Sequence, residues 1–355
     1  MKIAILGGGS WGTALAVVLS RSPRAHEISL WVHDAQLAES ISRTRENSPY
    51  LPGCILPTSI EVTNSLKRSL QRARIVIGAI PSAHARVVYT QALPYVEGLI
   101  RGDAAADETR GTTVLVSATK GLEPTTHLRM SEVITQVFSK QYHVPQMAVL
   151  SGPSFALEAA QADPTAVVVA SKAPIGDRRR YDHLADYIQA EFAAPYFRVY
   201  TNDDVLGVEL AGAMKNVIAI AAGACQGLGL RTNAIAALIT RGLAEMSRLA
   251  LALGGRPETL SGLAGLGDLV LTCTGALSRN RQVGIELGKG RLLKEILAST
   301  RTVAEGVGTA GALLALAREK NIDLPITEQV DAILNRGKAP RDAMAAIMER
   351  PQKRE

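Results

Sequence analysis

Residues 2–20 read KIAILGGGSWGTALAVVLS, and this stretch decides the fold of the first half of the chain. Its first five residues are mostly apolar and predict a short buried strand, whereas Thr13–Ser20 predicts a helix. Between them, Gly7, Gly9 and Gly12 form a G-x-G-x-x-G pattern. In this pattern the first glycine permits a tight turn, the second lets the backbone approach a pyrophosphate, and the third allows close packing of helix against strand. Because a helix N-terminus also favours anions, the stretch predicts dinucleotide binding, with a purely structural glycine turn as the alternative.

The end of the second expected strand, Ile28–Val32, bears on which dinucleotide is bound. An acidic residue at this point selects NAD, and a basic group accommodates the additional phosphate of NADP. The signal is split, because His33 could face that phosphate while Asp34 could accept from ribose hydroxyls or begin the next turn. The sequence therefore leaves the choice between NAD and NADP open.

The first half of the chain alternates short β-branched runs with helical patterns, which is typical of βαβ units and of a parallel sheet covered on both faces. The expected strands are Lys2–Leu6, Ile28–Val32, Ile75–Ala79, Thr113–Val116, Ala148–Leu150 and Thr165–Val169. The polar, acidic stretch 102–111 is interpreted as a surface loop or insertion.

Helical patterns replace the strands after about Tyr200. The expected helices are Val205–Ala224, Asn233–Leu253, Arg291–Ser299, Gly308–Lys320 and Ile326–Asn335. We therefore expect a Rossmann-type, dinucleotide-binding α/β domain over residues 1–198, followed by an all-helical substrate and catalytic domain over residues 199–345. Residues 346–355 are expected to form a flexible basic tail.

Length and composition exclude several classes of protein. The 355 residues predict two domains, and a content of 47% hydrophobic and 20% charged residues excludes a disordered, collagen-like or coiled-coil chain. No signal peptide is recognised, and the longest apolar stretch, Val217–Cys225, is too short to span a bilayer, so no transmembrane helix is expected. Cys54, Cys225 and Cys273 lack metal-ligand spacing and predict reduced thiols in the cytoplasm, with no metal site.

The net charge of +6 raises the question of a nucleic-acid or membrane partner. The excess lies partly in short local sets, such as Arg178–Arg180 and Lys353–Arg354, without a long basic stripe interleaved with aromatic residues. This distribution favours a solvated surface and a small anionic substrate, with no nucleic acid and no integral membrane contact.

A lysine in an apolar helix is the sharpest chemical signal. Lys215 lies between Leu210–Met214 and Val217–Ile220, where a buried ammonium needs a partner or a lowered pKa. A lysine with a lowered pKa can act as a general base, whereas the alternative is an exposed position on an amphipathic helix. Lys120 and Asp268 are further candidates, each with an alternative as an ordinary loop or capping residue. Ser278, Arg279 and Asn280 offer a hydroxyl, a planar fork and an amide to a phosphate or carboxylate, unless they form a solvated loop.

Together these segments closely resemble the bacterial-type NAD(P)-dependent glycerol-3-phosphate dehydrogenase family. The matching motifs occur in the family's order from end to end of the chain. They are GGGSWGTALA (Gly7–Ala16), SATKGLE (Ser117–Glu123), SGPSFA (Ser151–Ala156), ELAGAMKNVIAIAAG (Glu209–Gly223), LAGLGDLVLTCTGALSRNRQVG (Leu263–Gly284) and VAEGVGTA (Val303–Ala310). The longer 102–111 insertion departs from the family's usual loop.

The resemblance implies that the chain reversibly interconverts sn-glycerol 3-phosphate and dihydroxyacetone phosphate with NAD or NADP, supplying glycerol 3-phosphate for glycerophospholipid synthesis. It implies that Lys215 is the base, that Lys120 and Asp268 orient the reacting groups, and that substrate is held between the two domains. The implied substrate-binding residues are Lys120, Gly152, Ser154, Lys215, Asp268, Ser278, Arg279 and Asn280. The implied cofactor-binding residues are Gly7, Gly9, Ser10, Trp11, Gly12, His33, Lys120, Ala156, Arg279, Val303 and Glu305.

Two other functions compete with this one. Another NAD(P)-dependent hydroxyacid dehydrogenase or reductase would keep the glycine turn and the helical lysine, but would not require the run from Ser278 to Asn280. A non-catalytic NAD(P) sensor would not require Lys120, Lys215 and Asp268 together. The apolar helical half also makes a homodimer the expected oligomeric state.

Overall fold

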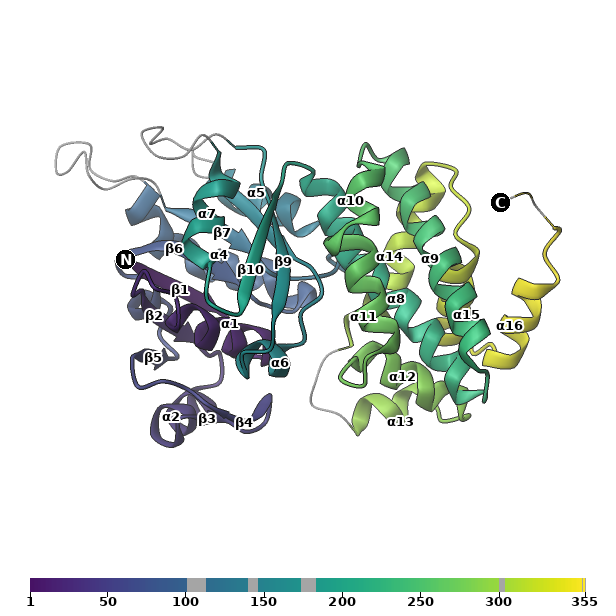
Figure 1. Cartoon of the computed structure of the whole chain (residues 1–355), viewed down its shortest axis with the longest axis horizontal. Helices are drawn as coiled ribbons and strands as arrows, with labels where there is room; N and C mark the ends of the chain where they lie inside the picture. Colours follow the sequence, from purple (N-terminus) through teal and green to yellow (C-terminus); the bar gives the residue numbers. More distant parts are fainter. Residues whose placement is uncertain (101–112, 140–145, 174–182, 300–303, 353, 355) are drawn as a thin grey trace. The chain divides into compact units, whose positions relative to one another are not determined.

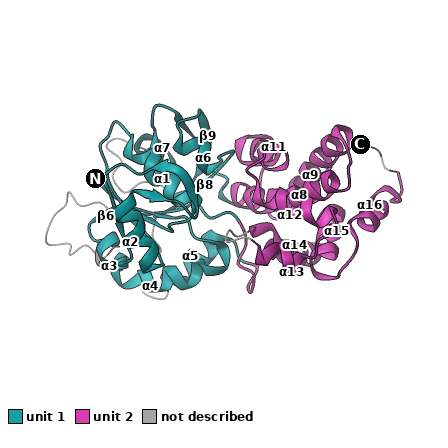
Figure 2. Cartoon of the chain, turned by 90° about the horizontal axis from the view of Figure 1, so that it is seen from below, with its two compact units in different colours: residues 1–120, 128–205 teal, residues 121–127, 206–355 magenta. Residues whose placement is uncertain are grey.

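The computed structural model describes residues 1–100, 113–139, 146–173, 183–299, 304–352 and 354. The chain forms two compact units (Figure 2). The first contains Met1–Lys120 and Leu128–Val205, and the second contains Gly121–His127 and Leu206–Glu355. The short segment Gly121–His127 thus joins the second unit although it follows a strand of the first.

The first unit is built on an eight-stranded sheet with the strand order β10-β9-β8-β7-β6-β1-β2-β5. Its strands are β1 (Lys2–Leu6), β2 (Glu27–Trp31), β5 (Ile60–Thr63), β6 (Ala73–Gly78), β7 (Val114–Ser117), β8 (Gln146–Ser151), β9 (Thr165–Ala170) and β10 (Phe197–Asn202). The strand predicted for each of the six β-branched runs is present, and the predicted Rossmann-type sheet is confirmed.

Helices cover both faces of this sheet (Figure 1). Alternate strand residues face opposite sides, so Ile3 and Ile5 enter one apolar core while Ala4 and Leu6 enter the other. The first core is closed by α1 (Ser10–Ser20), α2 (Ala35–Thr44), α6 (Ala156–Ala160) and α7 (Leu184–Phe192). The second is closed by α3 (Leu66–Leu70), α4 (Ser82–Ile100) and α5 (Met130–Ser139).

The sheet is parallel, as expected, except at one pairing, because β8 and β9 pair antiparallel. The helix between them, α6, has five residues. The connection packs α6 beside the sheet, and β9 then runs in the direction opposite to β8. A buried strand has the same apolar pattern in both directions, and the sequence therefore gave no sign of this reversal.

The strands that were not predicted lie at the margins. β5 and β10 end the sheet, and a separate two-stranded antiparallel ladder is formed by β3 (Glu46–Asn47) and β4 (Leu51–Ile55). In β10 the side chains alternate between buried and exposed, and Arg198 lies over the ring of Tyr200 with 5.2 Å to its centroid. Continuous β-branched runs are typical of strands buried on both faces. A half-exposed strand such as β10 lacks such a run and was therefore not predicted.

The second unit is helical. Its elements are α8 (Val205–Gly227), α9 (Thr232–Ala252), α10 (Pro257–Ser261), the π-helix η1 (Leu263–Gly267), α11 (Asp268–Thr274), α12 (Arg279–Gly288), α13 (Leu293–Ala298), α14 (Glu305–Glu319), α15 (Pro325–Asn335) and α16 (Pro340–Met348). Helix α8 is long and apolar enough to cross a bilayer, but 89% of its most apolar 18-residue window is buried inside the protein. Its side chains belong to the core of the second unit, which explains its composition.

Helices α8 and α12 cross at backbone contact through glycines. A Cβ atom on Gly223 would lie 2.0 Å from the carbonyl oxygen of Arg281, and one on Gly284 would lie 2.0 Å from that of Ile220. Residues with side chains do not fit at such a crossing. The glycines therefore set the separation between α8, which carries Lys215, and α12, which begins at Arg279.

Candidate active site

The glycine turn of the first unit has the geometry of an anion cradle. Gly7 has a φ of +124°, and its amide donates to the Trp31 carbonyl at 3.1 Å. A Cβ on Gly7 would lie 2.3 Å from the Ala79 oxygen, and one on Gly12 would lie 2.0 Å from the Gly7 oxygen. A Cβ on Gly9, in contrast, would meet no heavy atom within 4 Å. The turn is thus closely packed on its inner side and open at Gly9, which fits the pyrophosphate of a dinucleotide.

Helix α1 begins directly after this opening, at Ser10 and Trp11. Gly9 occupies its N-cap position and has no side chain with which to cap the first amides. The amides of the first turn and the positive end of the helix dipole therefore favour an anion at Gly9.

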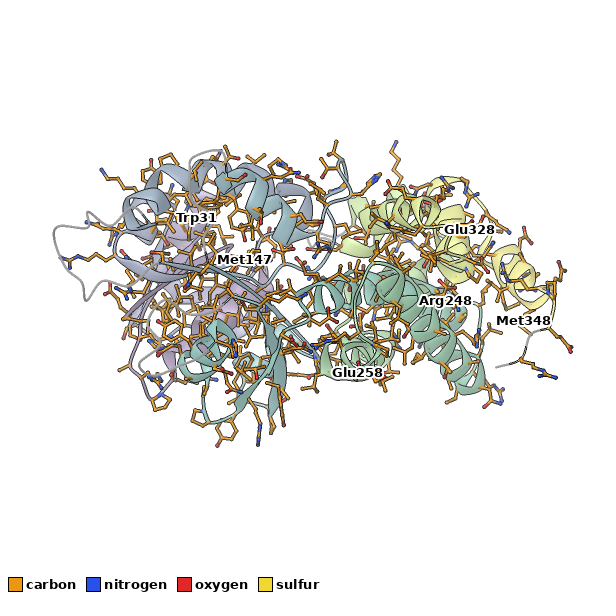
Figure 3. All side chains as sticks on the ribbon, turned by 90° about the horizontal axis from the view of Figure 1, so that it is seen from above. Trp31, Met147, Arg248, Glu258, Glu328 and Met348 are labelled. Carbon is orange, nitrogen blue, oxygen red and sulfur yellow. The ribbon has the colours of Figure 1, made fainter. Side chains whose placement is uncertain are left out.

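The end of β2 gives Asp34 a structural role. Its Oδ1 accepts from the Leu37 amide at 2.9 Å, so Asp34 is the N-cap of α2. His33 is exposed, and its ring centroid lies 5.8 Å from that of Trp31 in an edge-on arrangement. Trp31 itself, labelled in Figure 3, donates from Nε1 to the Asn64 carbonyl at 3.0 Å. Asp34 therefore begins the next helical turn, which was one of the two roles left open for it by the sequence.

A second cluster of predicted site residues lies after β7 and β8. Lys120 Nζ donates to the Gly152 carbonyl at 2.8 Å, and Ser154 Oγ donates to the same oxygen at 3.1 Å. Gly152 has a φ of +127°, a conformation that L side chains rarely adopt. Ala156, the first residue of α6, is packed against the sheet core. The carboxyl ends of two neighbouring strands thus bring Lys120, Gly152 and Ser154 together, as expected in an open α/β sheet.

Lys215 forms a buried polar cluster in the second unit. Its Nζ lies 2.6 Å from Asp268 Oδ1 and donates to Thr272 Oγ1 at 2.8 Å. Lys215 is 6% exposed, Asp268 is 1% exposed and Thr272 is 4% exposed. A buried lysine needs either a charged partner or a lowered pKa, and the structure gives Lys215 a charged partner in Asp268. A carboxylate this close favours an ammonium.

The neighbouring thiol takes no part in this charge pair. Burial raises the pKa of Cys273 to about 12, so that the thiol stays neutral beside Lys215. All three cysteines are free, with Cys54 and Cys273 buried and Cys225 half-buried.

A network of amides connects three helices near Lys215. Asn280 Nδ2 donates to Asn216 Oδ1 at 2.9 Å, and the Gly306 amide donates to Asn280 Oδ1 at 3.0 Å. Ser278 caps α12 by accepting from the Arg281 amide at 3.2 Å. The side chain of Asn280 is therefore committed to internal contacts, which leaves its backbone amide, at the start of α12, for an anion.

Arg279 is exposed at the N-terminus of α12, and its guanidinium interacts electrostatically with the carboxylate of Glu305. Glu305 is the first residue of α14. Val303 and the 102–111 insertion lie outside the described residues.

Two members of these clusters were not among the predicted site residues. Thr272 lies four residues after Asp268 on α11, so helical spacing alone places both on one face. Asn216 follows Lys215 as a second polar residue in an otherwise apolar run, and this unusual position could have indicated that it belongs to the site.

The chain matches one family along most of its length. Residues 2–175 match the description "NAD-dependent glycerol-3-phosphate dehydrogenase N-terminus", and residues 204–345 match the corresponding C-terminus. The chain is 50% identical over 351 residues to a relative from Koribacter versatilis (strain Ellin345) called glycerol-3-phosphate dehydrogenase [NAD(P)+], with 99% of this chain and 97% of the relative covered. A relative of the same name from Acidobacterium capsulatum is 49% identical, with 99% of this chain and 98% of the relative covered.

A solved structure gives the same result. The glycerol-3-phosphate dehydrogenase from Coxiella burnetii superposes with a TM-score of 0.87 at 39% identity, covering 98% of this chain and 99% of that chain. Its similarity extends over both the α/β and the helical part. The chain therefore belongs to the NAD-dependent glycerol-3-phosphate dehydrogenase family.

Proposed function

We propose that this chain reversibly interconverts sn-glycerol 3-phosphate and dihydroxyacetone phosphate with NAD or NADP. The observation that carries the mechanism is the buried cluster of Lys215, Asp268 and Thr272. It provides a proton-bearing amine that is held in place by two neighbours and is sheltered from water. Membership of the family and the glycine turn support the choice of cofactor.

The first unit binds the dinucleotide in this proposal. The turn from Gly7 to Gly12 would hold the pyrophosphate. The remaining contacts are assigned to Ser10, Trp11, His33, Lys120, Ala156, Arg279, Val303 and Glu305. When bound, the dinucleotide would supply the hydride exchange at C2 of the substrate through its nicotinamide.

Lys215 transfers the proton that accompanies this exchange. In the reductive direction its ammonium donates a proton to the oxygen on C2, and in the oxidative direction its amine removes that proton. Asp268 and Thr272 fix the position of Nζ, because both lie within hydrogen-bond distance of it. Lys120, held against Gly152, orients the same oxygen, with Ser154 beside it.

The phosphate of the substrate is assigned to the start of α12. Arg279 supplies a planar guanidinium, and the first amides of the helix add further donors, including that of Asn280. Ser278 caps the helix, and its hydroxyl thereby orders the turn to which the phosphate is assigned. Preference for NAD or NADP is left open by His33 and Asp34.

In the cell, the reaction would supply glycerol 3-phosphate for glycerophospholipid synthesis. We assign the protein to the cytoplasm and infer that it acts as a homodimer. Both assignments can be checked by fractionation of the native host cells and by sedimentation of the purified protein.

The direct test is oxidation of NADH and NADPH by the purified protein with dihydroxyacetone phosphate, followed through the absorbance of the reduced nicotinamide. Dihydroxyacetone without the phosphate is the matched control substrate. We expect rapid oxidation with the phosphate ester and little with the control, and the ratio of the two cofactor rates measures the preference. Equal rates with both substrates would refute the phosphate-specific function.

A further inference from the structure

One buried side chain outside the predicted site touches the glycine turn directly. Asn47 lies in β3 and is 0% exposed. Its Nδ2 donates to the Gly8 carbonyl at 2.8 Å and to Thr13 Oγ1 at 2.8 Å. A residue of the small β3–β4 ladder is thus bonded both to the turn and to the helix that follows it.

The contact with Gly8 fixes more than one carbonyl. Because a peptide bond is planar and trans, the Gly8 carbonyl and the Gly9 amide point in opposite directions. The carbonyl points inward to Asn47, so the Gly9 amide points away from Asn47. Gly9 is the open position of the turn, where an added Cβ would meet no atom within 4 Å. Asn47 therefore determines which end of this peptide dipole a bound pyrophosphate meets.

Such a lock is needed because glycines flank the peptide on both sides. Glycine accepts φ values of either sign, so this peptide can rotate with little steric cost. In the rotated arrangement the Gly8 carbonyl would face the pyrophosphate and repel it. The Asn47 bond opposes that rotation.

The orientation of the Asn47 amide is determined by its partners. The Gly8 oxygen can only accept, so a rotated amide would place two oxygens against each other. In the observed orientation Oδ1 is buried and has no hydrogen-bond partner among the described residues. A buried acceptor without a partner costs free energy. Asn47 thus keeps both Nδ2 hydrogen bonds although its own Oδ1 has none within the described part of the chain. This cost in free energy indicates that the bond to the Gly8 carbonyl serves more than the hydrogen bonding of Asn47 itself.

The backbone around Asn47 holds the side chain in place. Asn47 pairs with Leu51, which is 2% exposed, and the Asn47 carbonyl accepts from the Tyr50 amide at 3.1 Å. The side chain therefore extends from an anchored backbone, as a positioning residue requires.

We propose that Asn47 is a positioning residue of the dinucleotide site, which holds the Gly8–Gly9 peptide with its amide toward the pyrophosphate. The inference rests on the proposed assignment of the glycine turn to the dinucleotide. Asn47 touches no reacting atom, so its effect falls on dinucleotide binding and leaves proton and hydride transfer unchanged.

The test compares Asn47→Leu and Asn47→Ala with the control Thr13→Val. Asn47→Leu keeps a side chain of similar size but cannot donate to the Gly8 carbonyl, whereas Thr13→Val removes only the second contact of Nδ2. Dissociation constants for NADH and for ADP-ribose are measured by calorimetry without substrate, together with the melting temperature. We expect both Asn47 variants to bind both ligands about 10-fold more weakly, since one oriented hydrogen bond is lost. Thr13→Val should bind them as the unchanged protein does, and kcat at saturating NADH should be unchanged in all three.

Two results would overturn the proposal. One is a lowered melting temperature in the Asn47 variants with unchanged dissociation constants, which would give Asn47 a structural role only. The other is a crystal structure of the unchanged protein with NADH in which the Gly8 carbonyl faces the pyrophosphate, and this measurement does not depend on the folding of any variant. Absence of dinucleotide binding by the unchanged protein would refute the proposed function itself and is thereby distinguished from failure of the Asn47 role.

Discussion

Lys215 is costly for folding unless its charge is paired, and it is the residue to which we assign the proton transfer. Transferring an ammonium into an apolar core costs several kcal/mol, on the order estimated for buried ions, unless a counter-charge and hydrogen bonds compensate. Asp268 and Thr272 provide both at 2.6 Å and 2.8 Å. Removing either charge alone leaves the other uncompensated. Lys215 and Asp268 are therefore expected to be coupled in stability as well as in activity.

At the same scale, substitution of Arg279 tests the proposed recognition of the substrate phosphate. We predict that Arg279→Ala raises the KM for dihydroxyacetone phosphate by about 10- to 100-fold, because a charge-assisted contact with the phosphate is lost. Arg281→Ala is the matched control, since Arg281 donates to the Gly275 carbonyl within the protein. Steady-state kinetics check both variants. Equal KM values for Arg279→Ala and the unchanged protein would remove the phosphate role.

Glu245 provides a pH-dependent contribution to stability. It is buried on α9, and its carboxyl group accepts from the amides of Ile326 and Thr327 at the start of α15. Burial raises its pKa from 4.5 to about 7, although these hydrogen bonds oppose the shift. Between these values the folded state binds more protons than the unfolded state. The free energy of unfolding therefore falls as the pH rises through this window, by up to about 3 kcal/mol.

We predict that Glu245→Gln removes this part of the pH dependence, because the amide does not titrate. Urea denaturation at about pH 5 and about pH 8 measures it, with Glu258→Gln at an exposed glutamate as the control (Figure 3). The control should retain the full pH dependence. If the unchanged protein and Glu245→Gln showed the same difference between the two pH values, Glu245 would not be its source.

At the scale of the elements, the crossing of α8 and α12 determines where the start of α12, to which we assign the substrate phosphate, lies relative to Lys215. Backbone contact at Gly223 and Gly284 leaves no room for a side chain. The bond from Asn280 to Asn216 connects the same two helices near the start of α12, and the Gly306 amide adds α14. The close crossing and the amide network therefore both hold the start of α12 in place relative to α8.

We predict that Gly284→Ala lowers the free energy of unfolding by about 1–3 kcal/mol, because the added methyl group would overlap the Ile220 carbonyl. Gly311→Ala is the control, since Gly311 is exposed on α14 and an added Cβ would make only an ordinary contact at 3.7 Å. This control should stabilise the helix by up to about 1 kcal/mol. Chemical denaturation gives both values. A neutral Gly284→Ala would show that the helices can separate without cost.

At the scale of the whole molecule, the sequence predicted the type of each half and the strands of the sheet centre, because fully buried elements have strong apolar patterns. It did not predict the reversal at β9 or the marginal strand β10, since strand direction and half-exposure leave weak local signals. Lys215 was predicted as a candidate site residue because it lies in an apolar stretch of sequence. Thr272 and Asn47 were not, because their roles depend on contacts made by the fold: Thr272 with Lys215, and Asn47 with a turn 39 residues away.

The account depends most on Lys215 as the group that transfers the proton. The most direct measurement is kcat for reduction of dihydroxyacetone phosphate by Lys215→Ala, with NADH affinity measured on the same preparation. We predict a loss of about 100- to 10,000-fold in kcat, as is typical when a general acid or base is removed, with NADH affinity nearly unchanged. Near-normal turnover by Lys215→Ala would contradict the account.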